Sequence, residues 1–197
     1  MGTLSSGRGK PSVASLPLRV VLDTNVLFPF SLRDTLLRAA AAGYFQIYWS
    51  ENILDEASRN LVQTRAITEE QAKRLMYAMT SAFPEAMVKD YESLIASMPN
   101  DEEDRHVAAV AVKAEAQIIV TNNVRHFRSV PEGVDVYTAD DFLRDLFGLD
   151  PGGVIELLRD QAAALTRPPR SFEELLSGLA KSVPSFVSAV RERTALP

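Results

Sequence analysis

Four short apolar runs, each followed by a longer stretch with helical features, constrain the fold of this chain more than any other feature. The runs are rich in Val, Ile and aromatic residues and cover 20–22, 45–49, 117–121 and 134–137. Helices are expected at 32–42, 51–61, 68–82 and 102–116, and another after 138. Short strands that alternate with helices predict an α/β fold, with a short parallel sheet sandwiched by helices. The runs VVL and IIV lack a polar–apolar alternation, which is typical of strands buried on both faces.

The sequence predicts three regions along the chain. Residues 1–17 are rich in Gly, Ser and Pro and are expected to be a disordered tail. Residues 18–148 hold all the strand signals and form the predicted α/β domain. Residues 149–197 carry no strand signal and are expected to be a helical extension, with helices at 151–166 and 171–193. Residues 86–98 fit a strand or a loop equally well.

Composition excludes several classes of site and of partner. The chain has no Cys and only two His, so zinc thiolates, a Cys nucleophile and a multi-His metal centre are excluded. With a net charge of −5, a basic surface that coats nucleic acid is excluded, and such contacts must be local or made through cations. No apolar run approaches the roughly 20 residues of a membrane span, and residues 1–17 do not resemble a signal peptide. We therefore expect a cytoplasmic protein without membrane contact.

Carboxylate and amide side chains fall where the predicted strands end. Asp23 directly follows the first strand, and Asn122 and Asn123 follow the third. Ligand sites in open parallel sheets lie beyond the carboxyl ends of the strands, so these side chains are candidates for a common site.

The predicted helices add further acids. In the helix at 51–61, Glu56 lies next to the apolar stripe, whereas Asp55 points away from it. In the following acidic stretch, helix geometry does not decide between Asp101, Glu103 and Asp104. Asp101 is interpreted as a helix cap.

Three carboxylates that meet in one place require a counter-charge. If Asp23, Glu56 and Asp104 approached to about 5 Å, each pair would cost about 3 kcal/mol at an effective dielectric constant of about 20. Together the pairs would consume most of the stability of a domain, which is about 5–15 kcal/mol. Such a cluster must bind protons or a cation, and oxygen ligands without Cys or His select Mg²⁺ or Mn²⁺. That chemistry favours hydrolysis of phosphodiester bonds.

Four segments of the sequence resemble the motifs of PIN-domain ribonucleases. They are VVLDTNVL at 20–27, SENILDEASRNL at 50–61, PNDEEDRHVAAVAV at 99–112 and IIVTNNVRHF at 118–127. They occur in the expected order and spacing over roughly residues 18–145. The chain is most similar to bacterial VapC-type toxins of toxin–antitoxin pairs, in particular to a subgroup with a helical C-terminal extension.

The resemblance implies a Mg²⁺- or Mn²⁺-dependent endoribonuclease that forms a homodimer and is inhibited by a small antitoxin protein. It selects Asp104 over Glu103 and Asp101, so that Asp23, Glu56 and Asp104 hold the metal ion. Thr24, Asn25 and Thr121 are expected to orient these ligands. Many relatives carry Asp at the position of Asn123, which is therefore expected to assist catalysis as a neutral oxygen. With one negative charge fewer, we expect one well-bound ion.

Basic and aromatic residues near the fourth motif have alternative interpretations. Arg125 and Arg128 are candidates for binding RNA phosphates. His106 is expected to be packed or hydrogen-bonded near the start of its helix, and Trp49 and Phe127 to belong to the core.

Two other functions are compatible with parts of the sequence. Because the fourth acid is missing, the chain could be a catalytically weak protein that acts by docking RNA or a protein partner. In that case apolar residues of the extension would form an exposed face, namely Leu157, Leu158, Phe172, Leu175, Leu176, Phe186 and Val190. An Asp-nucleophile phosphatase or receiver fold also places Asp after a strand, but Thr24 and Asn25 do not supply the second acid that it requires.

Overall fold

The computed structural model describes residues 17–195. Residues 1–16 lie outside the described residues, and with them nearly all of the predicted tail. Four parallel strands form one sheet in the order β2-β1-β3-β4. They are β1 Arg19–Leu22, β2 Gln46–Tyr48, β3 Ile118–Val120 and β4 Asp135–Tyr137. All four were expected from the sequence, and the predicted α/β class is confirmed.

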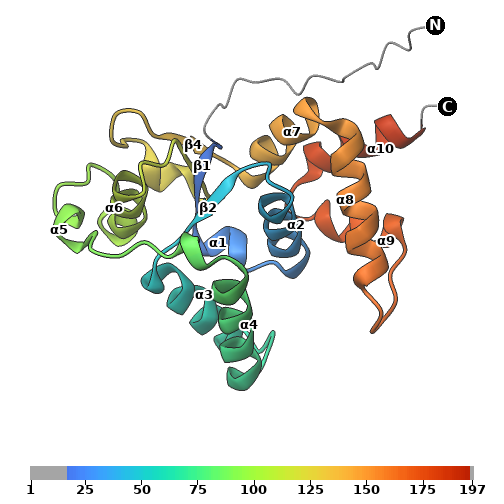
Figure 1. Cartoon of the computed structure of the whole chain (residues 1–197), viewed down its shortest axis with the longest axis horizontal. Helices are drawn as coiled ribbons and strands as arrows, with labels where there is room; N and C mark the ends of the chain where they lie inside the picture. The colour runs from blue at the N-terminus through green and yellow to red at the C-terminus, as the bar shows by residue number, and fades with distance from the viewer. Residues whose placement is uncertain (1–16, 196–197) are drawn as a thin grey trace, which may run out of the picture.

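Helices cover both faces of this sheet (Figure 1). The helix α6 (Arg105–Lys113) packs on β1 and β3 on one side, and α2 (Phe30–Ala41) lies on the other. The short helix α1 (Thr24–Leu27) follows β1, and α3 (Glu51–Gln63) packs against it. The helix α4 (Glu69–Ala82) packs on α3, and Thr68 and Gln71 form a capping box at its N-terminus. The side chains of β1 and β3 are buried almost completely, as expected for a sheet covered on both faces.

The segment between α4 and α6 resolves the ambiguity at 86–98 and corrects one predicted cap. It contains the 3₁₀ turn η1 (Pro84–Ala86), one bridge between Trp49 and Met87, and the short helix α5 (Glu92–Ile95). Asp101 was expected to cap a helix, but its side chain makes no capping hydrogen bond. A 3₁₀ turn, η2 (Glu102–Asp104), comes first, so that α6 begins only at Arg105 with Asp104 at its N-cap position. The core positions expected for Trp49 and Phe127 are confirmed.

The C-terminal region is helical, as expected, but it has one helix more than the sequence indicated. It consists of α7 (Ala139–Leu149), α8 (Pro151–Ala164), α9 (Phe172–Leu179) and α10 (Pro184–Ala195). The single helix expected at 171–193 is therefore wrong: Pro184 begins a new helix because proline is tolerated at a first turn and not inside a helix. Asp140 of α7 fixes this start, since its carboxylate accepts hydrogen bonds from the backbone N–H groups of Ser185 and Phe186 (3.0 and 2.7 Å).

The apolar face of the extension is buried and does not form a docking surface. Leu158, Leu175 and Phe186 have no exposed surface, and the other members of the predicted face are buried or partly buried. These side chains pack onto α2, α7 and one another and belong to the same core cluster as the sheet. The feature that would have made the chain a docking protein is thus used for its own folding.

Two hydrogen bonds of a buried polar side chain join the extension to the sheet domain. Gln161 of α8 has no exposed surface, accepts a hydrogen bond from Thr35 Oγ1 (2.8 Å) and donates one to the carbonyl of Ser31 (3.0 Å). Both partners lie on α2, so the two regions share hydrogen bonds as well as apolar contacts.

Replacement of Gln161 by Ala should therefore destabilise the whole chain. We expect a loss of about 2–3 kcal/mol, from two hydrogen bonds of about 1 kcal/mol each and the cavity that remains. Urea unfolding with the exposed Gln63→Ala as the matched control checks this, because a surface change should cost less than about 0.5 kcal/mol. Two separate transitions in the wild-type chain would contradict the joint core.

Candidate active site

Asp23 occupies the centre of the candidate site, at the end of β1. It follows a strand whose last three residues are buried, and its extended backbone makes it the N-cap of α1. The carboxylate accepts three hydrogen bonds: Oδ1 from the backbone N–H of Thr24 (2.7 Å), and Oδ2 from Asn25 Nδ2 (2.6 Å) and Thr121 Oγ1 (2.7 Å). The side chain is thus fixed by three donors, and Oδ1 keeps one lone pair without a partner among the described residues.

The environment of Asp23 disfavours the charged form of its carboxyl group. Burial raises its pKa to about 6, against 3.8 in water, although the hydrogen bonds from Thr121 and Thr24 act in the opposite direction. The negative charges of Asp104 and Glu56 raise the pKa further. Two acids from distant parts of the chain therefore lie close enough to Asp23 to interact with it.

Thr24, Asn25 and Thr121 link the elements that carry these acids. Thr24 Oγ1 donates to the carbonyl of Ile53 on α3 (3.2 Å), the helix that carries Glu56. Asn25 spans the gap between β1 and β3, because Nδ2 donates to Thr121 Oγ1 (2.8 Å) and Oδ1 accepts from the backbone N–H of Asn122 (2.7 Å). The three residues expected to orient the ligands therefore surround Asp23.

Asp104 and Glu56 each face a histidine. Asp104 Oδ2 lies 2.6 Å from His126 Nδ1, while Glu56 Oε2 lies 3.9 Å from His106 Nε2, which is too far for a hydrogen bond. His106 Nδ1 is directed at the carbonyl of Glu103 (3.1 Å), and its buried Nε2 has no hydrogen-bond partner among the described residues. Sequence reasoning missed this pairing of acids with histidines. Neither pair has a local signal in the sequence, because Asp104 and His126 are 22 residues apart and Glu56 and His106 lie on different helices.

Asn123 is turned toward His126 and Arg125. Its Nδ2 lies 2.8 Å from His126 Nδ1, and its Oδ1 accepts a hydrogen bond from Arg125 Nε (3.1 Å). Because a carboxylate can only accept, His126 Nδ1 carries the proton in its short contact with Asp104, so it cannot also accept from Asn123. Asn123 therefore belongs to the Asp104–His126 side of the site. Arg125 and Arg128 are both exposed, and Arg125 is the one that contacts Asn123.

The donor set matches a hard divalent cation in its chemistry. Asp23, Glu56 and Asp104 offer carboxylate oxygens, and the buried anion at Asp23 would be stabilised by a positive charge. Within residues 17–195, however, no group of three or more His, Asp or Glu side chains is already placed to hold one ion. The mutual repulsion of the acids opposes such a gathering, and His126 holds Asp104. A single ion would need these acids to draw closer together.

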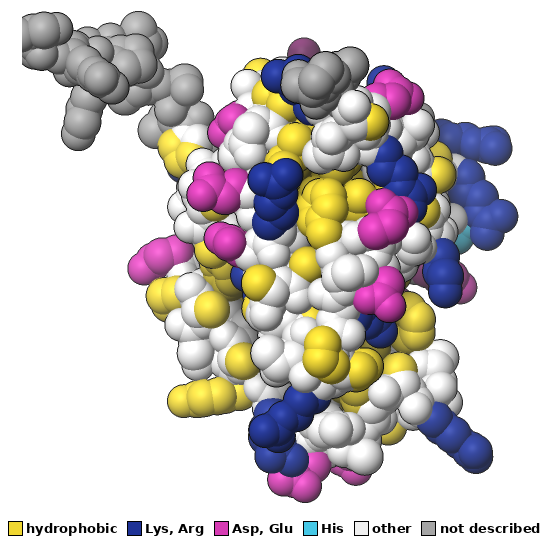
Figure 2. All heavy atoms as spheres, turned by 90° about the vertical axis from the view of Figure 1, so that its right-hand side faces the viewer, with side chains coloured by type: hydrophobic (Ala, Val, Ile, Leu, Met, Phe, Trp, Pro, Cys, Tyr) yellow, Lys and Arg dark blue, Asp and Glu magenta, His cyan; other side chains and the backbone are white. Residues whose placement is uncertain are grey.

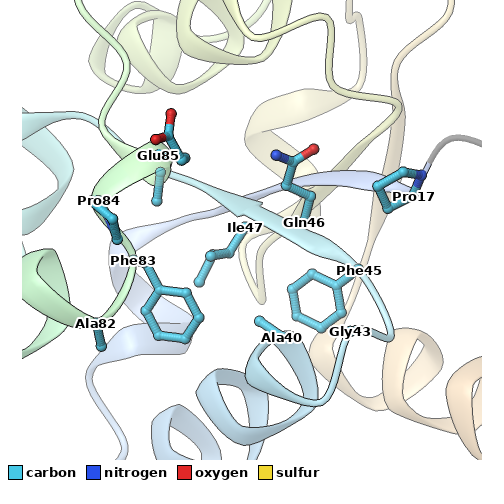
Figure 3. Close-up of a pocket in the computed structure, with 11 residues that line it drawn as sticks. Pro17, Ala40, Gly43, Phe45, Gln46, Ile47, Ala82, Phe83, Pro84 and Glu85 are labelled. Carbon is cyan, nitrogen blue, oxygen red and sulfur yellow. The ribbon is translucent and has the colours of Figure 1, made fainter.

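An apolar pocket lies elsewhere, at the outer edge of β2 (Figure 3). This cavity of about 380 Å³ is lined by Phe45, Ile47 and Phe83 among others, with Glu85 as its one carboxylate. None of its lining residues is a predicted site residue. This pocket is therefore not part of the candidate site at the end of β1.

Comparisons with known proteins agree with both parts of the chain. A family model described as "PIN domain" matches residues 19–125, and one described as "VapC50 C-terminal domain" matches residues 139–192. The chain is similar to a protein of Mycobacterium tuberculosis (strain ATCC 25618 / H37Rv) named "Putative ribonuclease VapC50", with 36% identity over 104 residues. The similar region covers 51% of this chain and 62% of that relative, which is less than two thirds of its length.

Proposed function

The chain belongs to the PIN-domain family, and from this premise we propose that it is a Mg²⁺- or Mn²⁺-dependent endoribonuclease, the toxin of a toxin–antitoxin pair. The observation that carries the proposal is the buried carboxylate of Asp23, which three donors fix at the end of β1 and which Glu56 and Asp104 destabilise. A buried carboxylate whose charged form is disfavoured by two neighbouring acids is a group that a catalytic cation would stabilise. The relative named as a ribonuclease supports the same reaction class.

In the proposed mechanism Asp23, Glu56 and Asp104 hold the ion. When bound, Mg²⁺ or Mn²⁺ lowers the pKa of a coordinated water and offsets charge on the phosphate. Thr121 and the Thr24 backbone favour the charged form of Asp23 and fix its orientation. His126 orients Asp104, as the outer partners of metal ligands do.

Arg125, Arg128 and Asn123 are proposed to serve the substrate side of the site. Both arginines are exposed, and Arg125 is held by Asn123 beside the Asp104–His126 pair. A guanidinium in this place can bind an RNA phosphate next to the scissile bond. The neutral amide of Asn123 adds no charge to the ligand set.

A homodimer, a small antitoxin protein and a cytoplasmic location complete the proposal. They are expectations from the family resemblance. In the part of the chain that the structure describes, every helix is too short or too polar to span a bilayer.

Cleavage of RNA by the purified chain tests the proposal. A 5′-labelled RNA mixture should be cut internally in the presence of Mn²⁺ or Mg²⁺, and EDTA should stop the reaction. Intact RNA under all these conditions, with a folded protein, would overturn the proposed function. Cleavage that persists in EDTA would support the nuclease activity but contradict its dependence on a metal ion.

The number of tightly bound ions gives a separate prediction. Because Asn123 is neutral, calorimetric titration with Mn²⁺ should show one tight site per chain in the absence of RNA. Asn123→Asp should add a second, weaker site. Asn122→Asp is the matched control, since its side chain is turned to the start of α7, where it accepts a hydrogen bond from the backbone N–H of Ala139. Two equally tight sites in the wild type would contradict the expectation.

A further inference from the structure

An exposed aromatic ring stands at the start of α2, beside the C-terminal extension. Phe30 is 54% exposed although it directly precedes the buried part of α2. It lines a groove of about 350 Å³ between the N-terminus of α2 and α9, together with Arg170, Gly178 and Lys181 among others. We call this the α2–α9 groove. It is formed jointly by the PIN domain and the extension.

The Phe30 ring has a guanidinium group near it and an exposed surface. The guanidinium of Arg33 lies 5.8 Å from the ring centroid. Arg33 is itself buried and donates hydrogen bonds to the carbonyls of Leu27 and Phe28. The ring is therefore backed by a fixed cation, and its exposed surface is free to stack on a flat partner.

Two cations, Arg170 and Lys181, line the groove, and no carboxylate among the described residues lines it. Within residues 17–195, no carboxylate lies within the 4.0 Å of an ion pair from Arg33, Arg170 or Lys181. Hydrogen bonds with Ser171 hold the pKa of Glu174 below its usual value, so this acid stays charged near Arg170, but it does not line the groove. Figure 2 shows the face of the C-terminal helices, where Lys and Arg side chains lie beside exposed hydrophobic ones toward the lower end, with Asp and Glu side chains just below them. A local positive groove in a chain of net charge −5 suits a polyanion.

The groove and the candidate active site are separated along the chain by the short helix α1. Asp23 caps the start of α1, and Arg33 holds the two carbonyls at its end. A helix of these four residues is about 6 Å long, and Phe30 follows two positions after the C-cap residue Phe28. The two sites are therefore close along the chain, with the buried residues of α1 between them.

We propose that the α2–α9 groove is a second RNA site, in which an unpaired base stacks on Phe30 and the flanking phosphates bind Arg170 and Lys181. Aromatic stacking with nearby cations is the usual way in which proteins bind single-stranded RNA. The inference rests on the proposed function and deepens it: the extension helps to select unpaired RNA.

RNA binding in EDTA separates this inference from catalysis. The full-length chain is titrated against a labelled, unstructured RNA of about 12 nucleotides, a length within the usual range of single-strand sites. Phe30→Ala should raise the Kd about tenfold, because stacking of one base is lost. The double variant Arg170→Gln, Lys181→Gln should reduce the slope of log K against log salt by about 1.4. A duplex of the same sequence should show no effect of Phe30→Ala.

Control variants keep the result interpretable. Tyr77→Ala removes another highly exposed aromatic ring, on α4, and Lys113→Gln removes an exposed cation on α6. Both should leave the RNA affinity within twofold. Gly178→Leu is a second probe: a Cβ there would meet Ser31 Oγ and Arg170 Nη1 at 3.6 and 3.9 Å, so the fold tolerates it while the larger side chain fills the groove. It should weaken RNA binding as Phe30→Ala does.

Three outcomes would overturn the inference. RNA affinity unchanged by both Phe30→Ala and Gly178→Leu would show that the groove does not bind RNA. A change in oligomeric mass with unchanged RNA affinity would identify a protein interface instead. If the wild-type chain neither binds nor cuts RNA, the proposed function fails as well. If the wild-type chain cuts RNA but the groove variants leave RNA affinity unchanged, only the second site is rejected.

Discussion

Asp23→Asn is expected to lower RNA cleavage in Mn²⁺ by at least 100-fold while the protein stays folded. The exchange preserves the shape of the side chain and removes the one carboxylate that three donors fix in the buried site. Loss of even an outer partner of a metal ligand typically costs 10–100-fold, so loss of a central ligand should cost more. Initial rates of internal cleavage at saturating Mn²⁺ measure the effect.

The matched control for this prediction is Asp55→Asn. Asp55 is one residue away from Glu56 on α3, but its side chain is exposed. The same chemical change at this position should leave the cleavage rate within about twofold. Equal activity of Asp23→Asn and the wild type would remove the enzyme interpretation, because no other described acid shares this burial and these contacts.

The second large effect is a pH-dependent gain in stability from the same substitution. Asp23 has a pKa of about 6 in the folded chain and about 3.8 when unfolded, because burial disfavours its charged form. Between these values the folded state binds a proton that the unfolded state does not, so stability falls as pH rises from about 4 to about 6 and stays lower above it. The cost at pH 8 is about 3 kcal/mol, at 1.36 kcal/mol per pH unit.

Asn carries no charge at any pH, so it escapes this cost. In metal-free buffer, the melting temperature of Asp23→Asn relative to wild type should be about 6–12 °C higher at pH 8 than at pH 4. The absolute gain at pH 8 will be reduced by the new contact between two amide NH₂ groups, that of residue 23 and that of Asn25. Thermal unfolding at both pH values measures the difference, and an equal gap at both would contradict the buried charge. Asp55→Asn should show no such dependence.

Mg²⁺ gives an independent check on the origin of this cost. If the ion binds at Asp23, saturating Mg²⁺ at pH 8 should raise the melting temperature of the wild type through mass action and leave Asp23→Asn almost unchanged. Stabilisation of both proteins to the same extent would place the ion elsewhere.

Much of the fold could be predicted from sequence because it follows from local patterns. The four apolar runs became the four strands, and Thr68 and Thr138 begin helices through side-chain hydrogen bonds with residues three positions ahead. The single helix expected at 171–193 and the cap expected at Asp101 were wrong for equally local reasons: a proline and a 3₁₀ turn interrupt the helical pattern.

In the candidate site, local sequence patterns predicted the positions of single residues but not the contacts between them. The sequence alone placed Asp23 after a buried strand and Glu56 beside the apolar stripe of α3, because strand ends and helix faces are set by nearest neighbours along the chain. Only the tertiary structure decided that His126 holds Asp104, that burial raises the energy of the Asp23 charge, and that the apolar face of the extension packs against α2 and α7. Each of these depends on contacts between residues far apart in sequence, and such contacts exist only after the sheet and its helices have packed together.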